Sequence, residues 1–126
     1  MSNANSCIRV YANEKQINSC KEDLEKVQGS ISKLSKAFNL AGNEIRLKIL
    51  FLLFKEEEMC PCDLSDVLGI SVSAVSQHLR KMKDGGLLLD KKIGQTIFYS
   101  IINENTEILI PVLEKISILN TVEIED

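Results

Sequence analysis

The stretch CDLSDVLGISVSAVSQHLRKMKDGGLL, residues 62–88, constrains the fold of this chain more than any other feature. Apolar residues recur at helical spacing on both sides of Gly69, a residue type that can adopt the left-handed conformation that stops a helix. Ser71 or Ser73 can cap the helix that follows, and Gly85–Gly86 end it. Two short helices joined by a tight glycine-containing turn are typical of a helix-turn-helix, which we place at about 62–86. The residues predicted to face inward are Leu64, Val67, Leu68, Val75, Leu79 and Met82.

A β-hairpin is predicted directly after this motif. In LLLDKKIGQTIFYSII, residues 87–102, the second half alternates between two faces as a strand does, and Gly94 supplies a turn. Helices followed by a helix-turn-helix and a two-stranded hairpin, or wing, form a winged-helix layout. The predicted fold class is therefore mainly α with a small β-hairpin.

Apolar helical segments flank this motif on both sides. Residues 43–54, NEIRLKILFLLF, are apolar nearly all round, which predicts a buried central helix. Residues 20–38 carry apolar side chains at spacings of three and four on one side only, which suits packing against a helix of a second subunit. A further helix is expected at about 105–119, with Pro111 in its first turn or at a kink.

Length and composition predict one folded domain. The chain has 126 residues, of which 44% are hydrophobic and 26% charged. We assign a mobile N-terminal arm to residues 1–19, the folded domain to 20–119 and a tail to 120–126. No apolar run approaches the roughly 18 residues of a membrane span, and the N-terminus lacks an apolar signal-peptide core, so the expected compartment is the cytoplasm.

Positive charge is concentrated on the second helix and the wing. Residues 78–92 contain five Lys and Arg against two Asp, a net charge of +3, whereas the whole chain carries −3, so the other 111 residues carry −6. Charged helix surfaces are also common on solvated faces, so the charge alone does not decide; together with the winged-helix layout it predicts contact with the phosphates of double-stranded DNA. The N-terminal half of the second helix is expected in the major groove, where Gln and Ser can contact bases. The predicted DNA-contacting residues are Ser73, Ser76, Gln77, Arg80, Lys81, Lys83, Lys91, Lys92 and Gln95.

An enzyme is not expected. The chain has one histidine, no phosphate-loop glycine pattern and no nucleophile–base constellation. The lone histidine, His78, is expected to pack or to form a hydrogen bond rather than to bind a metal.

Cys60 and Cys62 stand on either side of Pro61, at the start of the helix-turn-helix. In a regular helix or strand, residues two apart point roughly to opposite sides and cannot hold one ion. A proline suits the first helical position and pushes the residue before it out of helical geometry. Cys60 is therefore predicted to lie off the helix and Cys62 within its first turn, so that the two sulfurs can converge on a metal.

The sequence resembles the ArsR/SmtB family of metal-responsive repressors. The resemblance covers about residues 32–102 and rests on LAGNEIRLKILFLL, MCPCDLSDVLGISVSAVSQHLRKMKDGGLL and DKKIGQTIFYSI, which occur in the family's order. It implies a homodimer clasped by the first and last helices, and a repressor that leaves its operator when metal binds. The interface residues expected on this basis are Leu24, Val27, Ile31, Leu34, Leu109, Leu113 and Ile116.

The resemblance also bears on the ligand set, because two thiolates make a weak site. Arsenite sensors of the family can carry a third cysteine three residues after the second, where this chain has Ser65. The family's other solution uses cysteines of the N-terminal arm, and this chain has Cys7 and Cys20. Cys20 can alternatively be a small packing residue, because it continues the apolar stripe of its helix. The predicted metal ligands are Cys60, Cys62, Cys7 and Cys20.

All-sulfur ligation selects soft ions, namely Cd(II), Pb(II), Hg(II) or trivalent arsenic, antimony and bismuth. No second metal site is expected at residues 103–119, which contain neither His nor Asp. Two alternatives stay open from the sequence. One is a repressor of the same fold that senses oxidation through its thiols, and the other is an intracellular metal-binding protein that does not bind DNA.

Overall fold

The computed structural model describes the backbone of residues 7–125, and the side chains of these residues except residue 105 and residues 119–125. Residues 1–6 of the predicted arm and Asp126 of the predicted tail lie outside the described residues. The chain folds as two units that divide between Ser32 and Lys33, inside the first helix.

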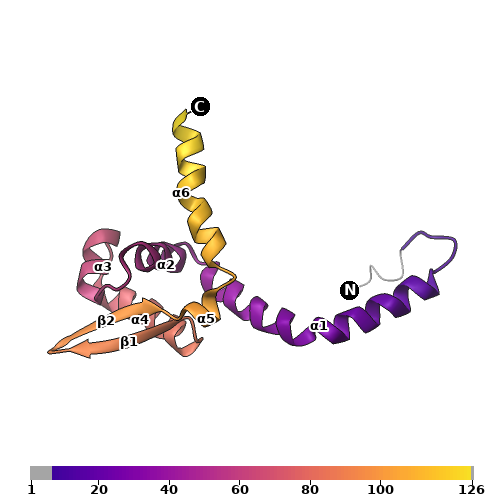
Figure 1. Cartoon of the computed structure of the whole chain (residues 1–126), viewed down its shortest axis with the longest axis horizontal. Helices are drawn as coiled ribbons and strands as arrows, with labels where there is room; N and C mark the ends of the chain where they lie inside the picture. The colour runs from indigo at the N-terminus through magenta and orange to yellow at the C-terminus, as the bar shows by residue number, and fades with distance from the viewer. Residues whose placement is uncertain (1–6, 126) are drawn as a thin grey trace. The chain divides into compact units, whose positions relative to one another are not determined.

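The described chain is mainly helical, with one two-stranded antiparallel sheet (Figure 1). This arrangement confirms the predicted fold class, a helix-turn-helix followed by a wing. In chain order the elements are α1 (Glu14–Ala41), α2 (Glu44–Glu56), α3 (Pro61–Leu68), α4 (Val72–Asp84), β1 (Leu88–Ile93), β2 (Thr96–Ile101), α5 (Asn103–Thr106) and α6 (Ile110–Glu125).

The first unit contains most of α1, which begins at Glu14 and not near Cys20, where the apolar stripe begins. Residues 14–19 are therefore helical, and the predicted limit of the arm at residue 19 is wrong. Asn13 caps the helix, since its side-chain oxygen accepts a hydrogen bond of 3.0 Å from the backbone N–H of Gln16. The stretch NEKQ, with Gln at the third helical position, resembles a capping box and is the signal that would have located this start.

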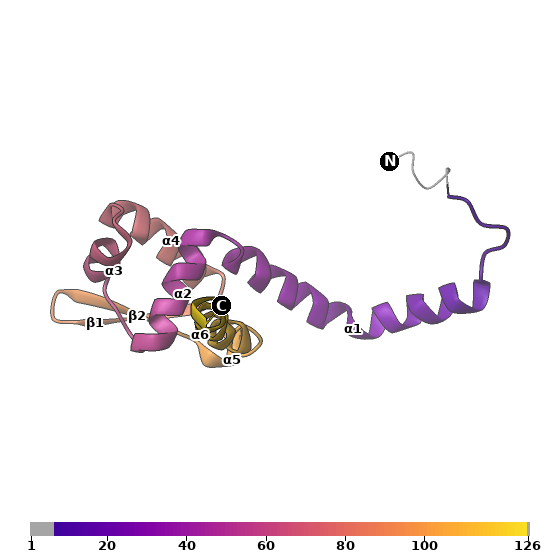
Figure 2. The ribbon, with the colours of Figure 1, turned by 90° about the horizontal axis from the view of Figure 1, so that it is seen from above.

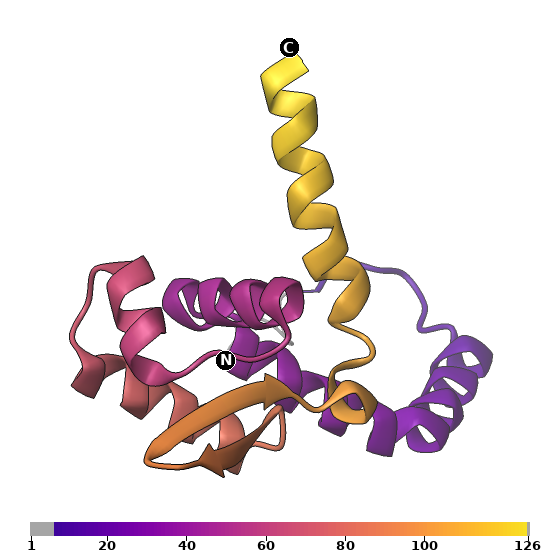
Figure 3. The same cartoon turned by 60° about the vertical axis from the view of Figure 1, so that its left-hand side comes forward.

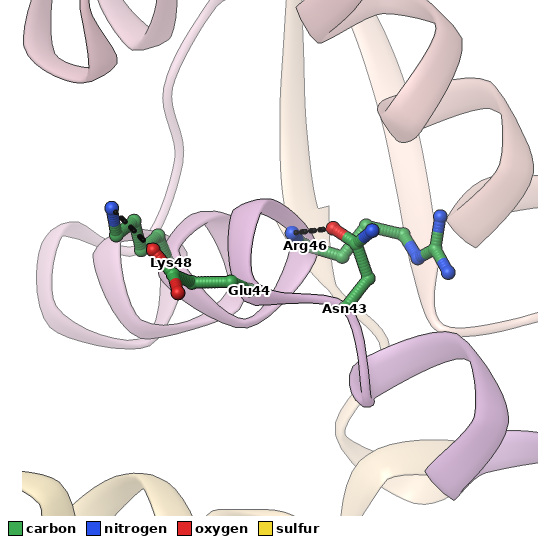
Figure 4. A network of polar contacts seen from close by, with 4 residues as sticks. All are labelled: Asn43, Glu44, Arg46 and Lys48. Atoms are coloured by element: carbon green, nitrogen blue, oxygen red, sulfur yellow. Dashed lines mark hydrogen bonds and ion pairs between the residues drawn. The ribbon is translucent and has the colours of Figure 1, made fainter.

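The second unit is built around α2, as its nearly continuous apolar sequence predicted. Ile49, Leu50 and Leu53 of α2 are fully buried. Asn43 caps α2 by accepting a 3.0 Å hydrogen bond from the backbone N–H of Arg46 (Figure 4). The other members of the buried core come from the flanking elements: Ala37, Ala41, Leu64, Val75, Leu79, Met82, Leu87, Leu88, Leu109 and Leu113.

The helix-turn-helix consists of α3 and α4, which contact each other and the hairpin (Figure 3). Gly69 ends α3 with φ = 69°, the left-handed conformation that its residue type allows. Ser71, the first of the two predicted candidates, caps α4 by accepting a 3.1 Å hydrogen bond from the N–H of Ala74. Val67 differs from the expectation, because it is exposed and not part of the core.

The wing is an antiparallel hairpin in which Leu88 pairs with Ile101 and Ile93 with Thr96. This register leaves a two-residue loop, Gly94–Gln95, and Gly94 has the positive φ of 64° that such a tight turn requires.

The C-terminal region contains two helices where one, at about 105–119, was predicted. The short α5 ends at Thr106, and α6 continues through most of the predicted tail to Glu125, with Pro111 in its first turn. Figure 2 looks nearly along α6, which packs on α2. Among the described residues, no helix is both long and apolar enough to cross a membrane.

Two of the residues predicted for a subunit interface belong instead to the core of the second unit. Leu109, just before α6, and Leu113, within α6, are only 4% and 1% exposed, because they join the core cluster that includes the buried side chains of α2. The prediction that they form a surface for a second subunit is therefore wrong. The apolar spacing at these two positions reflects intramolecular packing, whereas Ile108 and Val112 of the same segment are exposed.

Candidate metal centre and nucleic-acid interface

Cys60 occupies the N-cap position of α3, with an extended backbone at φ = −94° and ψ = 160°. Pro61 is the first helical residue, so Cys62 lies in the first turn. This geometry confirms that the proline separates one cysteine from the helix and places the other on it. The Cys60 side chain makes no capping hydrogen bond, so its thiol is not engaged with the helix end. Cys60 is 9% exposed, whereas Cys62 is exposed, so one cysteine of the pair is buried and the other lies at the surface.

Cys7 and Cys20 belong to the first unit, and both are exposed free thiols. Cys20 lies on α1 beyond its first turn, and its exposure gives no support to the alternative that it is a packing residue. Within the described part of the chain, no three His, Cys, Asp or Glu side chains gather into a group that could hold a metal ion. The structure thus places Cys60 and Cys62 at one helix start in the second unit, and Cys7 and Cys20 in the first.

Ser65 stands where arsenite sensors of the resembled family carry a third cysteine. Its hydroxyl donates a hydrogen bond of 2.5 Å to the carbonyl oxygen of Ile70, and its own carbonyl accepts one of 2.9 Å from the N–H of Gly69. Ser65 therefore stabilises the turn between α3 and α4.

The predicted base-reading residues lie in the first turns of α4. Ser73 and Gln77 are exposed, whereas Ser76 is half-buried. The inner face of the helix is held by fully buried Val75 and Leu79. The exposed polar side chains near the N-terminal end of α4 are thus fixed on a rigid element, which is the arrangement that groove reading needs.

The predicted basic residues are all exposed, but two of them are paired. Lys83 Nζ lies 2.9 Å from Asp90 Oδ2, and the pKa of Lys83 is raised chiefly by this hydrogen bond. Lys91 Nζ lies 3.5 Å from Glu58 Oε2. No ion pair is found for Arg80, Lys81 or Lys92 within the described residues. These three residues provide the unpaired positive charge of the predicted surface, and Gln95 adds a neutral polar side chain in the loop of the wing. The positive charge available to phosphates is therefore smaller than the sequence suggests.

Arg46 is a residue that the sequence reasoning missed. Its Nε donates a 2.6 Å hydrogen bond to the carbonyl oxygen of Leu40 near the end of α1, and its guanidinium approaches Nδ1 of His78 on α4 at 3.5 Å. Figure 4 shows this side chain extended away from α2. The pKa of His78 is lowered by burial and then by the charges of Arg46 and Lys81, so His78 is a hydrogen-bonding residue, as predicted.

Comparison with known proteins places the chain in a family. Residues 43–88 match the family described as "Bacterial regulatory protein, arsR family". The cadmium resistance transcriptional regulatory protein CadC homolog of Staphylococcus aureus is 32% identical over 104 residues, which cover 82% of this chain and 84% of that protein. The arsenical resistance operon repressor of Escherichia coli (strain K12) is 39% identical over 64 residues, which cover 51% of this chain and 55% of that protein.

A solved structure agrees with these similarities. Reduced HlyU from Vibrio cholerae N16961 superposes with a TM-score of 0.67 at 31% identity, covering 74% of this chain and 97% of that chain. Identity of this size, spread over most of both chains, together with the matching helix-turn-helix region, leads to one conclusion: the chain belongs to the arsR family of bacterial regulatory proteins.

Proposed function

We propose that this protein is a dimeric repressor that binds operator DNA and releases it when cysteine thiolates bind a soft metal or metalloid ion. One observation carries the proposal. Cys60 and Cys62 sit at the start of the first helix of the helix-turn-helix, with a backbone that separates them and no capping bond that engages the Cys60 thiol. Changes at this pair act directly on the element that supports the reading helix, since α3 packs against α4.

The donor set decides the class of inducer. Cys60 and Cys62 supply two sulfurs, Cys7 and Cys20 are the remaining thiols, and Ser65 contributes no sulfur. We therefore assign the inducer to the soft ions Cd(II), Pb(II), Hg(II) or As(III), held by the pair together with Cys7, Cys20 or both, from the same or the opposite subunit. The cadmium and arsenical regulators among the similar proteins agree with this class.

A second copy of the chain is the proposed partner of α1. Leu24, Val27 and Ile31 form a stripe on one side of the helix and are 55%, 44% and 44% exposed. Ile116 borders an apolar groove of about 510 Å³ between α2, α3 and α6, which offers a further surface for a partner. Dimerisation removes this apolar surface from water and pairs two reading helices at the spacing that operator half-sites demand.

The test is a DNA-binding titration with metal. An operator is first selected from a random duplex library, and its affinity is then measured with Cd(II), Pb(II), Hg(II), As(III) and Zn(II) under a phosphine reductant, which carries no thiol to compete for these ions. The wild type should lose affinity with a soft ion, and Cys60→Ser and Cys62→Ser should abolish that loss. Single Cys7→Ser and Cys20→Ser variants identify which of these thiols completes the site, and Ser30→Ala, at an exposed position of α1, serves as a control that removes no thiol.

Three outcomes would contradict the proposal. Release of DNA by Cys60→Ser, Cys62→Ser protein at the unchanged metal concentration would exclude the thiolate pair. Release by peroxide that the reductant reverses, without any metal response, would identify a redox sensor. Failure to select any DNA would favour a metal-binding protein that acts without DNA.

A further inference from the structure

The residue before the cysteine pair is hydrogen-bonded to the wing. The backbone N–H of Met59 donates to the carbonyl oxygen of Tyr99 at 3.2 Å, and the N–H of Tyr99 donates to the carbonyl oxygen of Met59 at 2.9 Å. Together these bonds form an antiparallel bridge on the outer edge of β2. Because Met59 directly precedes Cys60, the backbone that leads into the thiol pair belongs to the same hydrogen-bonded unit as the wing.

An ion pair lies next to this bridge. Glu58 Oε2 is 3.5 Å from Nζ of Lys91, and Lys91 belongs to β1. Residues 58 and 59 are thus joined to both strands of the wing, to β2 by backbone bonds and to β1 by side-chain charges. A displacement of this short segment must either break these contacts or move the hairpin.

The reading helix α4 is joined to the hairpin at the residue pair that also includes Tyr99. Tyr99 pairs with Asp90 across the two strands, and Asp90 accepts a hydrogen bond from Lys83 in the last turn of α4. The connection from Cys60 to α4 therefore consists of one peptide link, one β-bridge, one cross-strand pair and one ion pair. The elements that this connection joins, α3, α4 and the hairpin, contact one another in the second unit (Figure 3).

We propose that the Met59–Tyr99 bridge transmits occupation of the Cys60–Cys62 pair to the wing and lowers operator affinity by moving the wing relative to α4. This inference rests on the proposed function and specifies how that site is regulated. When both thiolates hold one ion, the backbone conformation at residue 60 is fixed by ligation as well as by its place at the helix start. The adjacent bridge passes any resulting shift to β2. Coupling requires an element whose contacts differ between the two states, and the bridge is made by the residue directly before Cys60.

The decisive comparison uses two substitutions at one residue. Met59→Pro removes the N–H that bonds Tyr99, whereas Met59→Ala keeps the backbone bridge, and both remove the same thioether side chain. The readouts are the ultraviolet thiolate-to-cadmium absorption band, the operator Kd without metal, and the factor by which saturating Cd(II) raises that Kd. Cd(II) is the probe throughout.

In the wild type and in Met59→Ala, we expect Cd(II) to weaken operator binding by about 5- to 150-fold, the usual range of allosteric coupling. In Met59→Pro the absorption band and its stoichiometry persist, but the factor falls toward 1. If Met59→Pro shows the band and the full wild-type factor, the bridge is not the link, although metal sensing itself stands. If the wild type shows neither band nor response, the proposed function fails and the inference fails with it.

A second pair of variants tests the bridge from its other side if Met59→Pro does not fold. Tyr99→Pro removes the N–H that donates to the carbonyl oxygen of Met59 on the outer edge of β2, whereas Tyr99→Ala keeps that N–H, and both remove the same aromatic side chain. The readout is again the ratio of the operator Kd values with and without Cd(II). A ratio near 1 in Tyr99→Pro together with the wild-type ratio in Tyr99→Ala supports transmission through the bridge, and the full wild-type ratio in both overturns it.

Discussion

Nζ of Lys83 lies 2.9 Å from Oδ2 of Asp90, so the last turn of α4 is tied to the first strand of the wing. The hydrogen bond that Lys83 donates to Asp90 is the main reason that the pKa of Lys83 is raised. The two elements predicted to contact DNA are thereby linked directly by an ion pair. The same ion pair occupies a lysine that the sequence assigns to phosphate binding. Asp90 therefore links α4 to the wing but reduces the positive charge that is available to DNA phosphates.

Asp90→Asn should strengthen DNA binding and steepen its dependence on salt. Release of Lys83 from its carboxylate partner makes a further ammonium group available to a phosphate, which corresponds to an increase of about 0.9 in the slope of log K against log salt. Fluorescence anisotropy over a series of salt concentrations measures this slope. Asp84→Asn is the matched control, since it changes the charge equally but leaves the Lys83–Asp90 pair intact. Equal slopes in the two variants would contradict the prediction.

Ser71 and Ser73 lie within one turn of α4, but we expect the first to affect the stability of the protein and the second to affect DNA binding. Ser71→Ala removes the N-cap of the helix and should lower the free energy of unfolding by about 1 kcal/mol. Ser73→Ala should change that free energy by less than about 0.5 kcal/mol, because its side chain is exposed. It should instead weaken operator binding by about fivefold, the value of one hydrogen bond of about 1 kcal/mol. Urea denaturation and operator titration of both variants provide the test, and an exchange of the two phenotypes would refute the assignment.

Much of the fold could be predicted because local signals and apolar periodicity agree over residues 43–102. Gly69, Ser71 and Gly94 each occupy the backbone position that their residue type favours. Pro61 likewise placed Cys60 off the helix, because the effect of proline on its neighbour is local. The thiol pair at the helix start was therefore within reach of sequence reasoning.

Other features depend on contacts between distant residues and were not predictable. The apolar spacing around Leu109 and Leu113 is the same whether the partner is α2 of the same chain or a helix of another subunit. The pairing of Lys83 with Asp90 needs the register of the hairpin, and the contact of Arg46 with His78 joins residues 32 positions apart. Neither of these two contacts can be inferred from charge counts or from apolar periodicity.

The exposed stripe on α1 should control the oligomeric state. Val27→Asp places a charge in the middle of the stripe, so we expect the dimer to dissociate at concentrations where the wild type remains associated. Ser32→Asp introduces the same charge at an exposed position on another side of the helix and serves as the control. Sedimentation velocity of the full chain distinguishes the species. A dimer that persists in Val27→Asp, or that dissociates equally in Ser32→Asp, would exclude this stripe as the interface.

The Arg46–His78 contact should make the stability of the protein depend on pH. Burial, Arg46 and Lys81 together lower the pKa of His78 below its ordinary value of about 6.5. The unfolded state therefore binds more protons than the folded state between these two pKa values, so the free energy of unfolding increases with pH in this window. Stability that is fully present above about pH 6.5 is lost as the pH falls through the lower pKa of the folded protein. Urea denaturation at about pH 7.5 and about pH 5 measures the loss. His78→Gln keeps an oxygen that can accept from Arg46 but cannot titrate, so its loss between the two pH values should be smaller, and an equal loss in both proteins would show that carboxylates alone cause it.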